Sequence, residues 1–363
     1  MRRTLLLLVL VTALVALAAG PAGACAGLVG ENGTIRLTRT STLAAHHNGI
    51  ERYVTSFEFE GAGEEVGSIV PLPGVPTKIE RGGDWTLQRL ALEVRPPRLS
   101  RPLAVEEFAA TSDARVLATA EIDALDITIL RGGGQAVGRW ALEHGFFLTP
   151  DAPEVLDFYS HRSKVFMAAR FDAARARDLG QTRGDGTPIM LTIPVEEPWV
   201  PLRILALGLD GSELVDADVF LLTDERPTLR TGGPGLALER SEPASEELLA
   251  DLRSDTGMGW VPDRMWLTYL RVGTPARTLD YDLAVSTRAG VAPSARMVGI
   301  GVPGGPDGDA VLTAGGPDGR VGFTPDIGSS NGASWPAAAL VVLGVVAVGV
   351  AIGRRSRSSA PLG

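Results

Sequence analysis

The sequence predicts an α+β fold, with a mainly antiparallel sheet and a few packed helices, followed by one C-terminal transmembrane helix. Segments in which apolar and polar residues alternate recur through the middle of the chain, which is typical of half-buried strands. Helical spacings lie between them irregularly, without the strand–helix repeat of a parallel sheet. Residues 337–353 form an uncharged apolar run near the C-terminus.

The composition is that of a folding protein with an acidic exterior. The chain has 363 residues, of which 45% are hydrophobic and 21% charged, with one Cys, so disorder and a disulfide scaffold are excluded. The formal net charge is −9, and five arginines lie in the two tails, so the part between the tails carries −14. This excess of carboxylates excludes nucleic acid as a partner.

The N-terminus has the three parts of a signal peptide, over residues 1–24. A charged start at Arg2 and Arg3 precedes an apolar run and then the small residues 22–24. Cleavage after residue 24 places Cys25 at the mature N-terminus, where its thiol is a candidate for lipidation. The residue three positions before it is Ala22 rather than Leu, which favours a cysteine that merely follows the cleavage site.

The chain then predicts a β-hairpin, a strand and a helix. Residues 34–43 and 50–60 alternate in polarity around Asn48-Gly49, the strongest short hairpin signal. Val66 to Leu72 reads as a strand that ends in prolines. A helix capped by Asp84 follows, with apolar residues at 87, 90, 91 and 94, and we expect it to lie on the sheet that contains that strand.

The remaining elements complete one extracytoplasmic domain or two subdomains over residues 25–288. The patterns predict strands at 115–120, 126–130, 164–171, 188–194 and 203–209, helices at 135–144, 154–159 and 246–252, and a final strand pair at 265–272 and 278–286.

The segment after this domain changes in composition. Residues 289–334 are rich in Gly and Pro and predict a stalk, although the turn motifs at 304–308 and 315–319 also fit a short hairpin through Val311-Leu312. The apolar run after the stalk spans about 26 Å as a helix. It predicts a transmembrane helix at 335–353 and a cytoplasmic basic tail at 354–363. The predicted location is the cell membrane, with the N-terminal domain outside.

Three separated segments resemble the bacterial family called domain of unknown function 2330. They are the strand Tyr53 to Phe59, the run Gly67 to Pro73, and residues 140–159. The resemblance covers residues 25–290 and implies a signal peptide, a Cys-Gly-type mature start and often a C-terminal anchor. This chain departs from it by lacking a second Cys, and the resemblance implies no activity.

No pattern of residues identifies a catalytic, metal or cofactor site. The four histidines lack zinc-site spacing, and His46 and His47 read as polar residues beside a turn. Gly132 to Gly138 lacks the spacing of a phosphate loop, and Asp280 with Asp282 is a weak calcium candidate without an EF-hand loop.

The best surface candidate is a rigid loop between a strand and a helix. It offers prolines, a cation, a carboxylate and an aromatic ring as a recognition site, at Pro73, Pro76, Lys78, Asp84 and Trp85. The sequence therefore favours a non-catalytic binding or envelope-organising module with a membrane partner and an envelope or extracellular ligand. The alternative is an exported hydrolase that uses carboxylates such as Glu64, Glu65 or Asp84.

Overall fold

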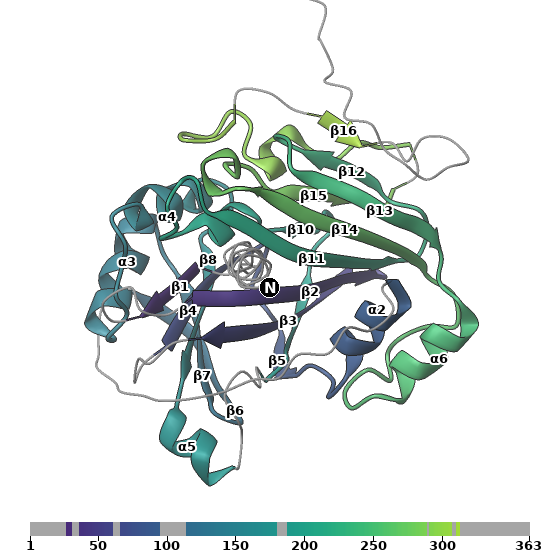
Figure 1. The fold of residues 1–363 in the computed structure, drawn as a ribbon, viewed down its shortest axis with the longest axis horizontal. Coiled ribbons are helices and arrows are strands. Elements are labelled where there is room, and N and C mark those ends of the chain that lie inside the picture. Colours follow the sequence, from purple (N-terminus) through teal and green to yellow (C-terminus); the bar gives the residue numbers. More distant parts are fainter. Residues whose placement is uncertain are drawn as a thin grey trace, which may run out of the picture. The chain divides into compact units, whose positions relative to one another are not determined.

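The computed structural model describes residues 27–30, 36–60, 66–94, 114–179, 187–288, 290–306 and 310–312 (Figure 1). These residues form three sheets with helices packed against them, which confirms the α+β class. Among the described strands, β2 and β11 are the one parallel pair, and every other pair is antiparallel.

The largest sheet has seven strands and is built on the predicted hairpin. Its order is β13 (Leu236–Pro243), β14 (Trp266–Pro275), β11 (Leu214–Thr223), β2 (Arg36–His47), β3 (Ile50–Glu60), β9 (Ile189–Pro194) and β5 (Lys78–Arg81). Asn48 (φ 53°) and Gly49 (φ 74°) both have positive φ, the backbone that a two-residue hairpin turn requires. The predicted hairpin is therefore confirmed.

Two smaller sheets complete the β-structure. The five-stranded sheet runs β1 (Gly27–Gly30), β4 (Val66–Leu72), β8 (Val165–Phe171), β7 (Leu125–Arg131), β6 (Arg115–Ile122). The four-stranded sheet runs β10 (Trp199–Val200), β15 (Leu283–Ser286), β12 (Thr228–Thr231), β16 (Ala310–Leu312).

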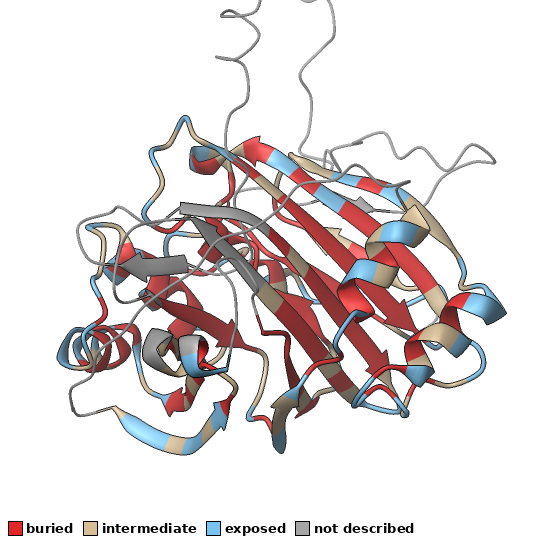
Figure 2. Ribbon diagram, turned by 60° about the horizontal axis from the view of Figure 1, so that its bottom comes forward, coloured by how far each residue is buried: buried red, intermediate tan, exposed pale blue. Residues whose placement is uncertain are grey.

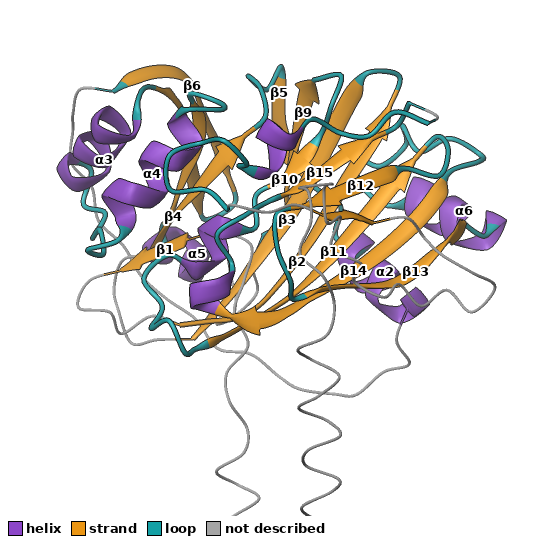
Figure 3. Cartoon of the chain, turned by 90° about the horizontal axis from the view of Figure 1, so that it is seen from above, coloured by secondary structure: helices purple, strands orange, loops and turns teal. Residues whose placement is uncertain are grey.

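Helices cover the sheets in two separate places (Figure 3). Helices α2 (Thr86–Val94) and α6 (Glu246–Ser254) pack on the seven-stranded sheet, and α3 (Gly134–Glu143) and α4 (Ala152–Ser160) pack on the five-stranded sheet. The Leu248 amide donates to the Ser245 hydroxyl, so the predicted cap of α6 is confirmed. Short elements complete the chain: α5 (Ala173–Asp178) and the 3-10 turns η2 (Arg203–Ala206), η3 (Ala276–Thr278) and η4 (Ala295–Val298).

Three apolar clusters hold these layers together, and central strands such as β8, β9, β11 and β14 are buried along most of their length (Figure 2). The first joins the inner faces of the three sheets, and Tyr53 and Leu191 lie in it. The second lies under α3 and α4, and the third under α2 and α6.

Three predicted elements differ in the structure. Helix α2 lies on the seven-stranded sheet rather than on the sheet of β4, because Leu87 and Leu90 pack in the cluster under α6. Residues 203–206 form the turn η2 instead of a strand, because the carboxylate of Asp282 accepts hydrogen bonds from two successive amides there, those of Leu202 and Arg203. The predicted final strand pair is split, since β14 and β15 belong to different sheets.

The ordered domain extends past the expected boundary at residue 288. Residues 290–306 contain η4, and Val298 and Val302 are buried, while the Val311-Leu312 segment forms β16 and pairs with β12 rather than closing a hairpin. The predicted signal peptide and transmembrane helix lie outside the described residues. Within the described ranges, no helix is both long and apolar enough to cross a membrane.

Gly134, the first residue of α3, lets this helix pack closely against α4. A Cβ at Gly134 would lie 2.5 Å from the Asp157 amide nitrogen in α4, whereas a Cβ at Gly133 would meet nothing within 4 Å. Because backbone cannot move aside cheaply, we expect Gly134→Ala to lower the free energy of unfolding by about 2 kcal/mol. Gly133→Ala is the matched control and should change it by less than about 1 kcal/mol. Urea titration measures the free energy of unfolding of both variants. Equal losses in the two variants would contradict the packing role of Gly134.

Candidate functional site

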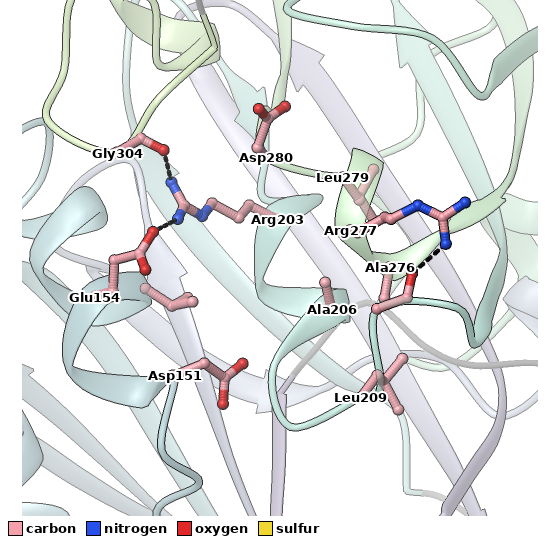
Figure 4. Close-up of a pocket in the computed structure, with 12 residues that line it drawn as sticks. Asp151, Glu154, Arg203, Ala206, Leu209, Ala276, Arg277, Leu279, Asp280 and Gly304 are labelled. Carbon is pink, nitrogen blue, oxygen red and sulfur yellow. Dashed lines mark hydrogen bonds and ion pairs between the residues drawn. The ribbon is translucent and has the colours of Figure 1, made fainter.

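A pocket of about 330 Å³ opens beside α4 and the turns η2 and η3 (Figure 4). This volume is at the lower end of the range for small-molecule sites. Charged and aliphatic side chains line it together. The charged ones are Asp151, Glu154, Arg203, Arg277 and Asp280, and the aliphatic ones include Val155, Ala206, Leu209 and Leu279.

Arg203 is the central charged group of the pocket. Its guanidinium donates to the Gly304 carbonyl and, at 2.5 Å, to the Glu154 carboxylate. The same group lies 4.3 Å from the centroid of the Phe158 ring, and the side chain is 8% exposed. Arg203 is therefore held in one position by its neighbours rather than moving freely in solvent.

A buried carboxylate positions the backbone of Arg203. Asp282 accepts from the amides of Leu202 (2.6 Å) and Arg203 (3.0 Å) and from the Tyr159 hydroxyl (2.9 Å), and it forms a buried ion pair with Arg162. Burial raises the pKa of Tyr159 well above its usual value, and the nearby Asp282 charge adds to this, so the phenol stays a neutral donor. This network fixes the wall of the pocket.

Three aromatic rings enclose the Arg162 side of that ion pair. The guanidinium lies 4.3 Å from the Phe158 ring centroid, 4.9 Å from that of Tyr159 and 4.7 Å from that of Trp199. It also donates to the Met297 carbonyl at 2.6 Å. A cation buried in this way is stabilised by the ring faces and by its carboxylate partner together.

Carboxylates outnumber cations around the pocket. Asp151, Glu154 and Asp280 line it beside Arg203 and Arg277, and the Arg277 guanidinium donates to the Gly211 carbonyl at 3.2 Å. The floor between these groups consists of aliphatic side chains. The pocket can therefore receive a small molecule that carries a positive charge and an apolar part.

Most side chains of the predicted recognition loop are buried or paired with other residues, and the Trp85 ring is partly exposed. Pro76 is buried, Lys78 starts the edge strand β5 and pairs with Glu80 at 2.5 Å, and Trp85 is 37% exposed. Pro73 lies half-buried just after β4.

Asp84 does not cap α2 as predicted. Its carboxylate accepts from Arg81 (2.8 Å) and Thr256 (3.1 Å), and the helix starts two residues later, at Thr86. The loop is held by Asp255, whose carboxylate accepts from the amides of Asp84 (2.9 Å) and Trp85 (3.1 Å) and from the Thr86 hydroxyl (2.7 Å). Burial raises the pKa of Asp255, but these hydrogen bonds outweigh it and lower the pKa below its usual value.

The other candidate residues are separated from the pocket or from each other. His46 lies two residues before the hairpin turn and is buried, and His47 lies 2.5 Å from Asp224. Asp280 lines the pocket, whereas the buried Asp282 carboxylate is engaged by Arg162, Tyr159 and two backbone amides. Among the described residues, no three His, Cys, Asp or Glu side chains could hold a metal ion. Cys25, Glu64 and Glu65 lie outside the described residues.

Sequence reasoning missed most of the pocket. The sequence points to Asp280 only through its spacing from Asp282, and the local pattern around Arg203 predicts a strand. The predicted helix at 154–159 is confirmed as α4, but nothing in the local pattern connects Glu154 to a segment 49 residues away. A signal was present in Arg203, a charged residue within an otherwise apolar run from Val200 to Leu207.

Comparison with known families identifies the class of this domain. Residues 19–231 match the family described as "uncharacterized protein conserved in bacteria (DUF2330)". The match covers more than half of the sequence, and the chain belongs to this family, which confirms the resemblance seen in the sequence. No curated protein matches the chain.

Two solved structures show weak likeness. The crystal structure of baculovirus P35 has a TM-score of 0.38 at 10% identity, over 72% of this chain and 100% of that chain. A mutated baculovirus P35 after caspase cleavage has a TM-score of 0.31 at 9% identity, over 69% and 96%. TM-scores this low do not show a shared fold.

Proposed function

We propose that the protein is a membrane-anchored extracytoplasmic binding protein that takes a small amine-bearing ligand in the pocket beside Arg203. The observation that carries the proposal is the lining of that pocket, in which Asp151, Glu154 and Asp280 stand around an aliphatic floor with only two guanidinium groups. An ammonium group gains from the excess carboxylates, and its alkyl or ring part covers the floor.

The positions of the two arginines support a binding role for this pocket. Glu154 and the Gly304 carbonyl occupy the Arg203 guanidinium, and the Gly211 carbonyl occupies that of Arg277. Both cations are thus engaged by groups of the protein, while the pocket as a whole keeps an excess of negative charge. The part of the chain between the two tails carries a net charge of −14. This negative charge also attracts cationic molecules to the domain.

Titration of the full-length chain in detergent tests the ligand class. We expect putrescine and glucosamine to bind and to raise the melting temperature, with succinate and glucose as the anionic and uncharged counterparts that do not. Asp280→Asn should weaken the amine binding about tenfold, because it removes one charge from the pocket. Asp263→Asn is the matched control, since that carboxylate is 92% exposed and pairs with Arg253 elsewhere. Equal response to amines and anions would contradict the proposal.

The anchoring part of the proposal rests on the two ends of the sequence. The residues 1–24 have the pattern of an export signal, and residues 335–353 have that of a membrane span followed by Arg354 and Arg355. We expect full-length chain to stay in the membrane fraction and to be cleaved by external protease, and a chain that ends before Trp335 to be released. If the truncated chain stayed in the membrane fraction, and its Cys25→Ala form did so too, the C-terminal anchor would be contradicted.

A further inference from the structure

Glu51 is a carboxyl group sealed inside the domain, away from the pocket. Its side chain is 0% exposed, and neither carboxyl oxygen has a hydrogen-bond partner among the described residues. The register of β3 pairs Glu51 with His46 on β2 and with Ile193 on β9, on the face that meets the inner cluster. An ionised carboxylate in such surroundings is strongly disfavoured.

His46, which pairs with Glu51, contacts two segments that lie beside the end of the hairpin, at Val195 and Thr287. Its Nε2 lies 2.9 Å from the Val195 carbonyl oxygen and its Nδ1 lies 3.3 Å from the Thr287 hydroxyl. Val195 follows β9, Thr287 follows β15, and the Val195 amide also donates to the Gly49 carbonyl at 3.0 Å. These contacts hold Val195 and Thr287 against the end of the hairpin, at the residue that pairs with Glu51.

Among the described residues, few charged groups lie near Glu51 and the end of the β2–β3 hairpin. On the paired strands, His46 faces Glu51 from β2 and apolar Ile193 faces it from β9. From the four-stranded sheet, Val200 and Val285 belong to the same inner cluster. At the rim, Glu197 pairs with Arg288 at 2.5 Å, and His47 lies 2.5 Å from Asp224 at the hairpin turn. The carboxylates of Glu197 and Asp224 are therefore engaged at the rim rather than with Glu51.

We propose that Glu51 is the proton-binding group of a latch formed by residues 195–197 and 286–288 over the end of the β2–β3 hairpin. With Glu51 protonated, its uncharged carboxyl fits under the closed segments. When Glu51 gives its proton to solvent, the carboxylate requires water, and the segments held by His46 open to admit it. Burial raises the pKa of Glu51 to about 8, which supports a protonated group at neutral pH.

Hydrogen exchange of the full-length chain between about pH 6 and about pH 9 tests the latch, after correction for intrinsic rates. The reporter within the latch is the Val195 amide, which donates to the Gly49 carbonyl. The Val285 amide, which donates to the Pro198 carbonyl, reports on the residues that directly flank the two latch segments. We expect their protection to fall about tenfold above the pKa of Glu51 in the native chain and to stay constant in Glu51→Gln. Glu247→Gln, on the exposed side of α6, should behave like the native chain.

Two outcomes would overturn the latch. One is the same pH profile in the native chain and in Glu51→Gln, and the other is a loss of protection that extends equally to α6, which would be global unfolding. Infrared spectroscopy supplies a measurement that does not depend on opening. At neutral pH the native chain should show the carbonyl band of a protonated carboxylic acid that Glu51→Gln lacks, and a native spectrum without this band would also overturn the proposal.

Discussion

Asp282→Ala is expected to lower the free energy of unfolding by about 4 kcal/mol. The substitution leaves the Arg162 cation buried without its carboxylate and removes the acceptor of the Tyr159 hydroxyl and of two backbone amides. An uncompensated buried charge is costly because the surrounding rings and strands exclude water. Denaturant titration of the full-length chain measures the effect.

A surface ion pair supplies the control for Asp282. Asp216 and Arg271 lie 3.1 Å apart with side chains 27% and 47% exposed, so Asp216→Ala should cost less than about 1 kcal/mol. Replacing both Arg162 and Asp282 with apolar residues should recover part of the loss, since no unpaired charge then remains. If Asp282→Ala proved as mild as Asp216→Ala, the buried pair would not hold η2 and α4 together.

Glu51→Gln is expected to stabilise the domain relative to the native chain, by an amount that grows as the pH rises. The unfolded chain ionises Glu51 near its ordinary pKa of 4.5, whereas the folded chain holds the proton up to about pH 8. Between these values the folded state binds more protons, so this group lowers the stability of the native chain by about 1.4 kcal/mol per pH unit, and above about pH 8 the loss is complete. Glutamine cannot ionise and removes this slope.

The measurement is the difference in unfolding free energy between Glu51→Gln and the native chain at several pH values. We expect this difference to grow by about 3 kcal/mol from about pH 4 to about pH 7, because other groups titrate alike in both proteins and cancel. Glu247→Gln, an exposed substitution, should show no such growth. A difference that stays constant with pH would mean that Glu51 is ionised inside the fold.

Local patterns in the sequence were enough for many elements. The Asn48-Gly49 turn, the strands of the five-stranded sheet between residues 115 and 171 and the Ser245 cap all depend on neighbours within a few residues, and the structure confirms them. The family was also recognisable from three short segments, and the match over residues 19–231 confirms it.

Long-range contacts decided the other elements. Residues 203–206 have the composition of a strand, but the Asp282 carboxylate, 79 residues from Arg203, takes the amides of a turn. No local pattern predicts the strand β11 (Leu214–Thr223), because its alternation is short and its second half, Val219 to Leu222, is continuously apolar and buried on both faces. Residues 290–306 read as stalk from their Gly and Pro content, although Val298 and Val302 are buried against the domain.

The sequence by itself determined the elements that depend on local spacing, the acidic charge and the family. It also predicts a signal peptide and a membrane anchor. The tertiary structure alone decided which charges meet. Glu154, Arg203 and Asp280 become one pocket, and Glu51 becomes a sealed carboxyl, only because strands and helices distant in the chain pack side by side. Burial and pairing of a charge depend on those distant neighbours, and a one-dimensional pattern contains no record of them.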